Sequence, residues 1–141
     1  MNFHLTTIAC KTEQPIDIID ITDDVRAALE ATDLKQGTVT LLSRHTTACI
    51  NINEREEQLK QDMTTFLKRF IPKDGDWLHN LDTIDGRDNA HSHLLGLFMT
   101  SSETVPFADG KLLLGQWQSI FFVELDGPRE KREVLVHIQG E

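Results

Sequence analysis

The stretch from Leu81 to Gly96 concentrates side chains that could do chemistry. It reads LDTIDGRDNAHSHLLG, with three aspartates, one arginine and two histidines. Neutral imidazole is the commonest nitrogen ligand of zinc-like metals, and carboxylates move protons or orient other groups. The stretch therefore predicts one wall of a metal or phosphate site. The plainer alternative is a solvated connection that precedes an ordinary helix or strand.

Other histidines could complete such a site. His45 lies in RHTTACININE and His79 in DWLHN, while His91 and His93 follow the acidic stretch. Three imidazoles around one ion would leave a position open for water or substrate. The spacing by itself is weak evidence, because no H-E-x-x-H motif is present. The loop that starts at Asp82 also departs from the EF-hand pattern.

The remaining candidate residues each have a structural and a functional interpretation. Cys49 follows His45 by four residues, but small buried thiols are commoner than nucleophilic ones. Glu54 is either a helix-start acid or a general base. Trp117 is more typical of a core than of a substrate platform, and the alternating charges of 127–133 favour a solvated turn over an anion site. Nucleotide-binding glycine motifs and G-x-S-x-G are absent.

Composition limits the classes of function. The chain has 141 residues, of which 39% are hydrophobic and 26% charged, as in globular proteins. Its formal net charge of −9 argues against unaided binding to nucleic acids or anionic membranes. The first residues lack a signal-peptide pattern, no apolar run approaches the ~20 residues of a membrane span, and the two cysteines form no C-x-x-C. We therefore expect a cytoplasmic protein.

Hydrophobic periodicity predicts the elements that must position these residues. In the first half we expect strands over 3–10 and 15–21, a helix over 22–32, β structure over 38–52 and a helix over 53–72. Within 38–52 the apolar positions change from odd to even numbers, which predicts a bulge or turn near Arg44–Thr47. Residues 73–89 form a long irregular stretch, and such loops are usually functional or mobile.

The second half predicts a short helix followed by strands. On a helix, His91 and His93 lie about 200° apart, so only one can face an ion, and periodicity does not decide which. Asp109-Gly110 predicts a tight hairpin turn, and 131–139 a final strand. The strand WQSIFFVEL is apolar on both faces and must be covered twice, by a sheet, a helix layer or another subunit. We predict one α+β domain over 1–141, with mainly antiparallel sheets in a sandwich-like core and two or three helices.

Several strings together resemble the YjbQ-like family, a group of small proteins described as secondary thiamine-phosphate synthases. They are RHTTACININE, LHN, NAHSHL, VPFADGKLLLGQWQSIFFVELDGPR and VHIQG, and they extend over nearly the whole chain. The resemblance implies a β-rich α+β subunit that assembles as a homotrimer, with a histidine-bearing cleft near the interface. It also implies a small-molecule enzyme that joins a pyrimidine-methyl pyrophosphate to a thiazole phosphate.

The resemblance also implies roles for individual residues. The metal ligands would be His45, His79 and His93, with His91 only a neighbour, and the ion would be zinc-like, with magnesium as an alternative. Glu54 and Asp88 would be catalytic, Glu54 by handling protons, and both Asp85 and Asp88 would orient imidazole rings. The residues implied in substrate binding are Asn53, Asp85, Trp117 and Gln118.

One departure and two alternatives accompany the resemblance. Thr100 stands where relatives usually have glycine, and its side chain could narrow the cleft. The same histidines could serve a metal-dependent hydrolase in which Glu54 activates water. The chain could also be a non-catalytic module that binds a small molecule.

Overall fold

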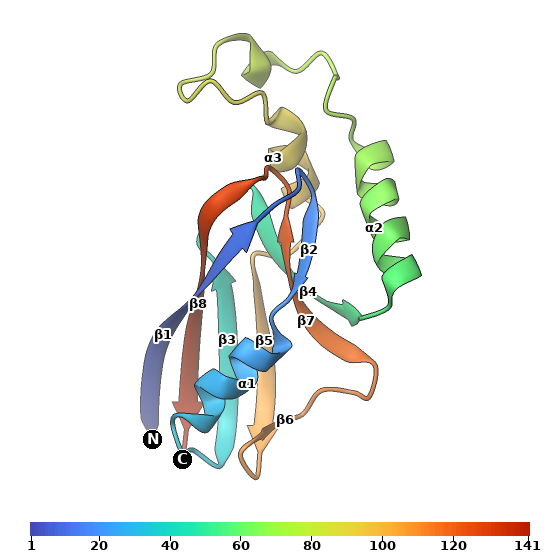
Figure 1. Cartoon of the computed structure of the whole chain (residues 1–141). Coiled ribbons are helices and arrows are strands. Elements are labelled where there is room, and N and C mark those ends of the chain that lie inside the picture. The colour runs from blue at the N-terminus through green and yellow to red at the C-terminus, as the bar shows by residue number, and fades with distance from the viewer.

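The strands form two antiparallel sheets in the computed structural model, which describes residues 1–141 (Figure 1). The eight strands are β1 (Asn2–Thr12), β2 (Asp17–Asp20), β3 (Gln36–Ser43), β4 (Ala48–Glu54), β5 (Ser102–Ala108), β6 (Lys111–Leu112), β7 (Gln118–Glu124) and β8 (Arg129–Gly140). The larger sheet has the order β1-β8-β3-β5-β6 and the smaller one β2-β7-β4. Every strand pair is antiparallel, which confirms the predicted α+β class.

Three α-helices and one 3-10 helix accompany the sheets. They are α1 (Thr22–Glu30), α2 (Glu57–Phe70), η1 (Leu78–Leu81) and α3 (Ala90–Gly96). Helix α2 begins where the Glu56 side chain accepts the Gln58 amide, and it ends in Lys68 and Arg69, whose charges suit the carboxyl end of a helix. None of these helices is long and apolar enough to cross a membrane.

The core has two parts, one on each face of the smaller sheet. Ile120 and Phe122 of β7 pack with α1 and the larger sheet in the main cluster. Phe121 and Val123 point the other way, into a cluster that includes Leu67 of α2 and other residues of α2 and α3. The prediction that this strand is covered on both faces is confirmed. In Figure 1, α2 stands along one side of the molecule and α3 lies at the upper end of the sheets.

The predicted interruption near Arg44–Thr47 is present, but it is a change of sheet. β3 belongs to the larger sheet and β4 to the smaller one. Between them the Ser43 hydroxyl donates to the Ala48 carbonyl at 2.7 Å, which closes the connection. The apolar parity changes because each strand turns its hydrophobic residues toward the core from a different sheet.

The predicted hairpin turn is confirmed at Asp109-Gly110. Both residues have positive φ, 53° and 72°, as a tight turn between paired strands requires. Strand β6 is short, however, and the chain then leaves for β7 in the smaller sheet. The connection from β6 to β7 therefore links the larger sheet to the smaller one.

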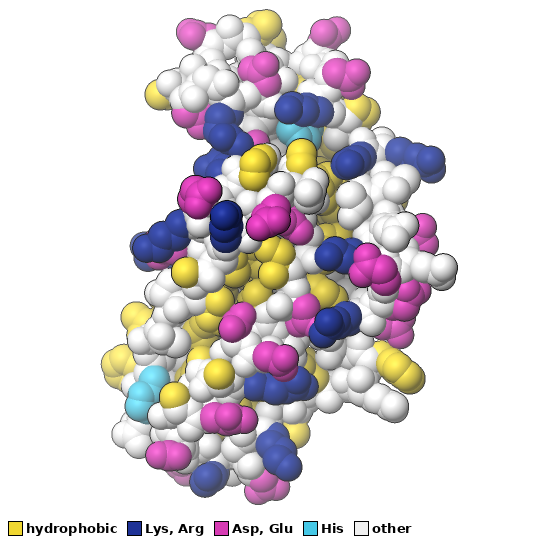
Figure 2. Space-filling model, viewed as in Figure 1, with side chains coloured by type: hydrophobic (Ala, Val, Ile, Leu, Met, Phe, Trp, Pro, Cys, Tyr) yellow, Lys and Arg dark blue, Asp and Glu magenta, His cyan; other side chains and the backbone are white.

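A buried ion pair joins the two sheets. Glu124 ends β7 and Arg132 lies in β8; their exposed fractions are 0% and 3%. The Arg132 guanidinium donates to both carboxylate oxygens of Glu124 and to the Thr47 hydroxyl at 2.8 Å. The interpretation of 127–133 as a solvated turn is therefore wrong for Arg132. Elsewhere on the surface, acidic and basic side chains are interspersed, as the face in Figure 2 shows.

Candidate functional site

A groove of about 580 Å³ lies between the β3–β4 connection and helix α3, and we call it the histidine groove. The connection brings His45 to one wall, and α3 with the segment after it brings His93 to the other. The residues that line it are Leu42, Ser43, Arg44, His45, Thr46, Ala48, Cys49, His93, Gly96, Leu97, Met99 and Ser101. None of them is an aspartate or glutamate, although the chain has 23 such residues.

The ring of His45 is held in one orientation by the backbone. Its Nε2 accepts the Glu133 amide at 2.8 Å, so the lone pair of Nε2 is in use. Burial lowers the pKa of His45, the nearby Arg132 lowers it further, and the ring is therefore neutral near pH 7. In the neutral ring the proton is then on Nδ1. His45 offers a ligand a hydrogen-bond donor, not a metal-binding lone pair.

His93 is the second histidine that lines the groove. Burial lowers its pKa and the neighbouring His79 lowers it further, while Asp126 and Asp85 act in the opposite direction. The two rings meet edge to face, with centroids 5.0 Å apart. Neither ring nitrogen of His93 has a hydrogen-bond partner within the chain, so one lone pair is free to accept a proton.

A polar network fixes His79 beside His93. The Asn89 side chain donates to Asp126 at 2.8 Å and accepts from the Nε2 of His79 at 2.9 Å. Asp126 also receives Arg87 and Arg129, each at 2.9 Å. Burial by itself would raise the pKa of Asp126, but these hydrogen bonds lower it to about 2. Asp126 is thus a permanent anion that orients its neighbours.

The three predicted metal ligands do not form one cluster within the chain. No group of three or more His, Cys, Asp or Glu side chains is placed to hold a metal ion. His79 and His93 are together, whereas His45 shares only the groove with His93 and has its Nε2 occupied. The fourth histidine, His91, is buried on the other side of α3, as the helical spacing predicts, and its Nδ1 has no partner.

Four of the predicted site residues lie at the other end of the smaller sheet. Asn53 and Glu54 end β4, and Glu54 is paired with Gln118 at the start of β7. The length of β4 from Ala48 to Glu54 corresponds to about 20 Å. Within one chain these residues, with the exposed Trp117, are therefore separate from the histidine groove. Within one chain Glu54 is thus not placed to act as a base beside His45.

The two aspartates of the irregular stretch that were predicted as site residues, Asp85 and Asp88, differ in their surroundings. Asp85 accepts the Arg87 amide at 3.1 Å and lies near enough to raise the pKa of His93. Asp88 is exposed and has no hydrogen bond to an imidazole. Thr100 does not line the groove, because its hydroxyl binds the Ile50 carbonyl at 2.8 Å.

The sequence did not single out Asn89 or Asp126 as site residues. Asn89 stands in the irregular stretch as the residue just before α3, and Asp126 follows the long apolar strand. The only local signal was their polarity next to buried segments. Arg44 was likewise overlooked as a groove residue, although it is adjacent to His45.

Comparisons with known proteins cover almost the whole chain. A family model described as UPF0047 protein YjbQ-like matches residues 6–141. A UPF0047 protein of Methanothermobacter thermautotrophicus is 39% identical over 140 residues, which are 99% of this chain and 94% of that protein. The UPF0047 protein YugU of Bacillus subtilis is 36% identical over 129 residues, with 90% and 93% of the two chains covered.

Solved structures agree with the fold described above. A YbjQ-like protein of unknown function from Sulfolobus solfataricus has a TM-score of 0.93 and 40% identity, with 99% of each chain covered. An uncharacterised protein of the yjbq/upf0047 family from Clostridium acetobutylicum has a TM-score of 0.86 and 36% identity, with 95% and 99% covered.

These comparisons correct the expected function. The relatives are described only as UPF0047 proteins, and the similar structures as proteins of unknown function or uncharacterised. None of the descriptions supports thiamine phosphate synthesis or dependence on a metal. The prediction of a metal-dependent enzyme resembling thiamine-phosphate synthases is therefore wrong.

Proposed function

The chain belongs to the UPF0047 YjbQ-like family, and we propose that it binds a small organic anion in the histidine groove, where His93 acts as a base. The observation that carries the proposal is the absence of carboxylates from the lining. In a chain with a net charge of −9, a groove free of acidic residues is a local environment that an anion can enter.

The donors of the groove suit an anionic head group. Arg44 offers a guanidinium, and its salt bridge to Glu133 at 3.7 Å is at the surface and weak enough to exchange for a ligand. His45 adds its Nδ1–H, and the hydroxyls of Thr46 and Ser101 lie in the same lining. A carboxylate or phosphate would accept hydrogen bonds from several of these groups.

The rest of the lining is apolar and suits the organic part of the ligand. Leu42, Cys49, Leu97 and Met99 contribute to this surface. The volume of about 580 Å³ is in the range of small-molecule sites. A bound anion favours the charged form of a neighbouring imidazole, so a neutral His93 on the wall can take up a proton from solvent when the anion binds. The hydrogen bond from the Glu133 amide instead keeps the His45 ring a donor.

A ligand screen tests this proposal. The full chain is mixed with small carboxylates and phosphate monoesters, and the melting temperature and the ring nitrogen signals of histidine are recorded. We expect binding to raise the melting temperature and to move the His93 signals toward the protonated form. Arg44→Ala and His93→Ala should each weaken binding by roughly tenfold. Arg26→Ala removes an exposed arginine of α1 and is the matched control.

The outcomes of the screen are distinct. Binding that is unchanged in both groove variants, or a panel in which nothing binds, would contradict the proposal. Elemental analysis of the same preparations measures whether the protein contains a divalent metal ion, whose presence stays a prediction. The three histidines do not meet in one chain, so no step of the proposed binding involves a metal.

We also propose that copies of the chain assemble, as a homotrimer, through the outer face of the larger sheet. Phe3, Leu5 and Leu42 are 72%, 61% and 38% exposed on this face. The strand register places them in three rows with residues of β8, β3 and β5 that include no Asp, Glu, Lys or Arg. An uncharged face with large apolar side chains favours a protein contact.

A further inference from the structure

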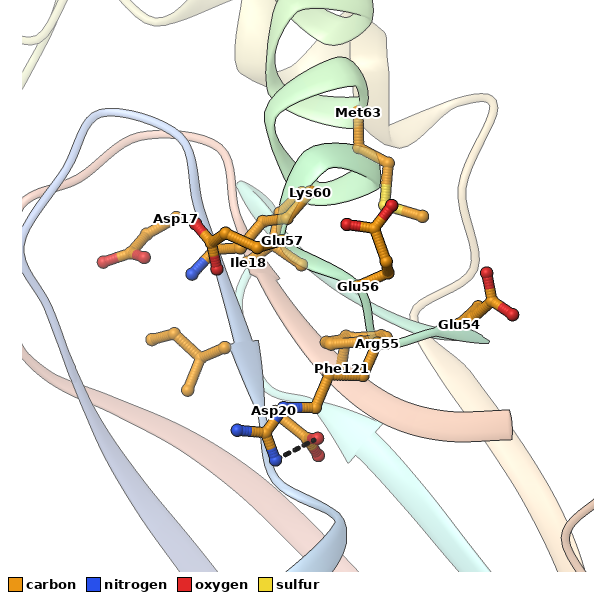
Figure 3. Close-up of a pocket in the computed structure, with 11 residues that line it drawn as sticks. Asp17, Ile18, Asp20, Glu54, Arg55, Glu56, Glu57, Lys60, Met63 and Phe121 are labelled. Carbon is orange, nitrogen blue, oxygen red and sulfur yellow. Dashed lines mark ion pairs between the residues drawn. The ribbon is translucent and has the colours of Figure 1, made fainter. Parts of the chain in front are cut away.

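A second groove, which we call the β2–α2 groove, lies between strand β2 and helix α2. It consists of two adjoining cavities of about 520 and 390 Å³. Both cavities are lined by Asp17, Ile18, Glu57 and Lys60, so they form one continuous channel. In Figure 3 the side chains of Glu57 and Lys60 extend from α2 into this space beside β2. The groove shares no residue with the histidine groove.

The floor of the groove is an open sheet edge. Strand β2 pairs with β7 on one side only and is the last strand of the smaller sheet. The Ile21 amide donates to the Ile120 carbonyl at 2.9 Å, and in antiparallel pairs the bonded residues alternate. The backbone N–H and C=O groups of Ile18 and Asp20 therefore point away from β7, to the open side of the sheet. Such an edge can accept another strand.

The charge of the groove is unequal along its length. The larger cavity is lined by the acids Asp17, Asp20, Glu54, Glu56 and Glu57 and by only two bases, Arg55 and Lys60. Asp20 pairs with Arg55 at 3.6 Å, and the Glu56 carboxylate caps α2. Glu54 and Glu57 have no ion pair within the chain. The smaller cavity adds the uncharged side chains Gln14, Gln61, Thr64 and Thr65 and one further base, Lys68, so the acidic excess lies in the larger cavity.

We propose that the β2–α2 groove binds an extended, basic segment of another polypeptide, which adds to β2 as a further strand. The backbone of the segment would pair with Ile18 and Asp20, and its alternate side chains would point toward α2. Lysine or arginine at those positions would meet Glu57, which extends from α2 beside β2. Charge complementarity thus selects a basic partner, and the sheet edge selects an extended one.

A labelled peptide tests the proposal. The probe is a fluorescent eight-residue peptide in which lysine alternates with threonine, titrated into the full chain and followed by anisotropy. We expect saturable binding that weakens as salt is added, because the contact is between exposed charges. Glu57→Lys should weaken binding by about tenfold. Asp62→Lys makes the same change of charge on α2 outside the groove and should leave binding unchanged.

Two further measurements separate strand pairing from simple charge attraction. The same peptide with alternate backbone amides methylated keeps its charge but cannot pair as a strand, so it should bind at least about tenfold more weakly. In the unmethylated complex, hydrogen exchange of the Ile18 and Asp20 amides should slow. Equal binding of the methylated peptide, or equal loss in the Asp62 and Glu57 variants, would overturn the proposal.

Discussion

At the scale of single residues, burial and hydrogen bonding decide which histidine can do what. The sequence offers four similar imidazoles at positions 45, 79, 91 and 93, but the backbone amide of Glu133 fixes His45 as a donor. Asn89 fixes His79, and α3 buries His91. Only His93 keeps free nitrogens in the groove, and this difference is the basis of its proposed role as the base.

The same burial makes the protein sensitive to mild acid. Burial is the main cause that lowers the pKa of His45, His91 and His93 below 6.5. As the pH falls through 6.5, the unfolded chain takes up protons that the folded chain does not, so the free energy of unfolding should decrease. Urea unfolding between about pH 8 and about pH 5 measures this slope. We expect His91→Leu to reduce it, and an unchanged slope would contradict this account.

At the scale of elements, periodicity predicted the helices but not the assignment of strands to sheets. The apolar spacing of Leu59, Met63 and Phe70 indicated α2 correctly, because helical periodicity is a local property. The interruption near Arg44–Thr47 was also visible in the sequence. That β3 and β4 separate into different sheets there was not, because strand pairing depends on residues far apart in the chain.

We expect the buried Glu124–Arg132 ion pair to hold the two sheets together. Arg132→Met would leave the Glu124 carboxylate buried without its partner, and we expect a loss of about 3–5 kcal/mol in the free energy of unfolding. Lys11→Met breaks a surface pair with Glu130 of 4.0 Å and should cost no more than about 1 kcal/mol. Denaturant titrations of the two variants provide the comparison. Equal losses would show that the buried pair has no special role.

At the scale of the whole molecule, the outer face of the larger sheet is exposed in the isolated chain and would be covered in the proposed assembly. Strands β1, β8, β3 and β5 turn one side to the core and leave the other uncovered. The predicted sites also divide at this scale: the histidine groove is at one end of the smaller sheet, and Glu54 and Trp117 are at the other.

Assembly through this face has a direct test. We expect sedimentation velocity to give the mass of a trimer for the native chain and that of a single chain for Leu5→Lys, because a buried unpaired charge in the contact is costly. Ala27→Lys places the same charge on the exposed side of α1 and is the control. A native chain that sediments as a monomer would contradict the proposal.

Local patterns in the sequence determined the helices, the Asp109-Gly110 turn, the doubly covered strand and the family. These features depend on neighbours within a few residues or on strings that can be read directly. Tertiary structure alone decided that the Glu133 amide donates a hydrogen bond to the Nε2 of His45 and that Arg132 lies buried against Glu124. It also decided that no aspartate or glutamate lines the histidine groove. Each of these facts requires two segments that are distant in the sequence to meet. The free energy of their contact depends on both segments, so neither segment alone predicts it.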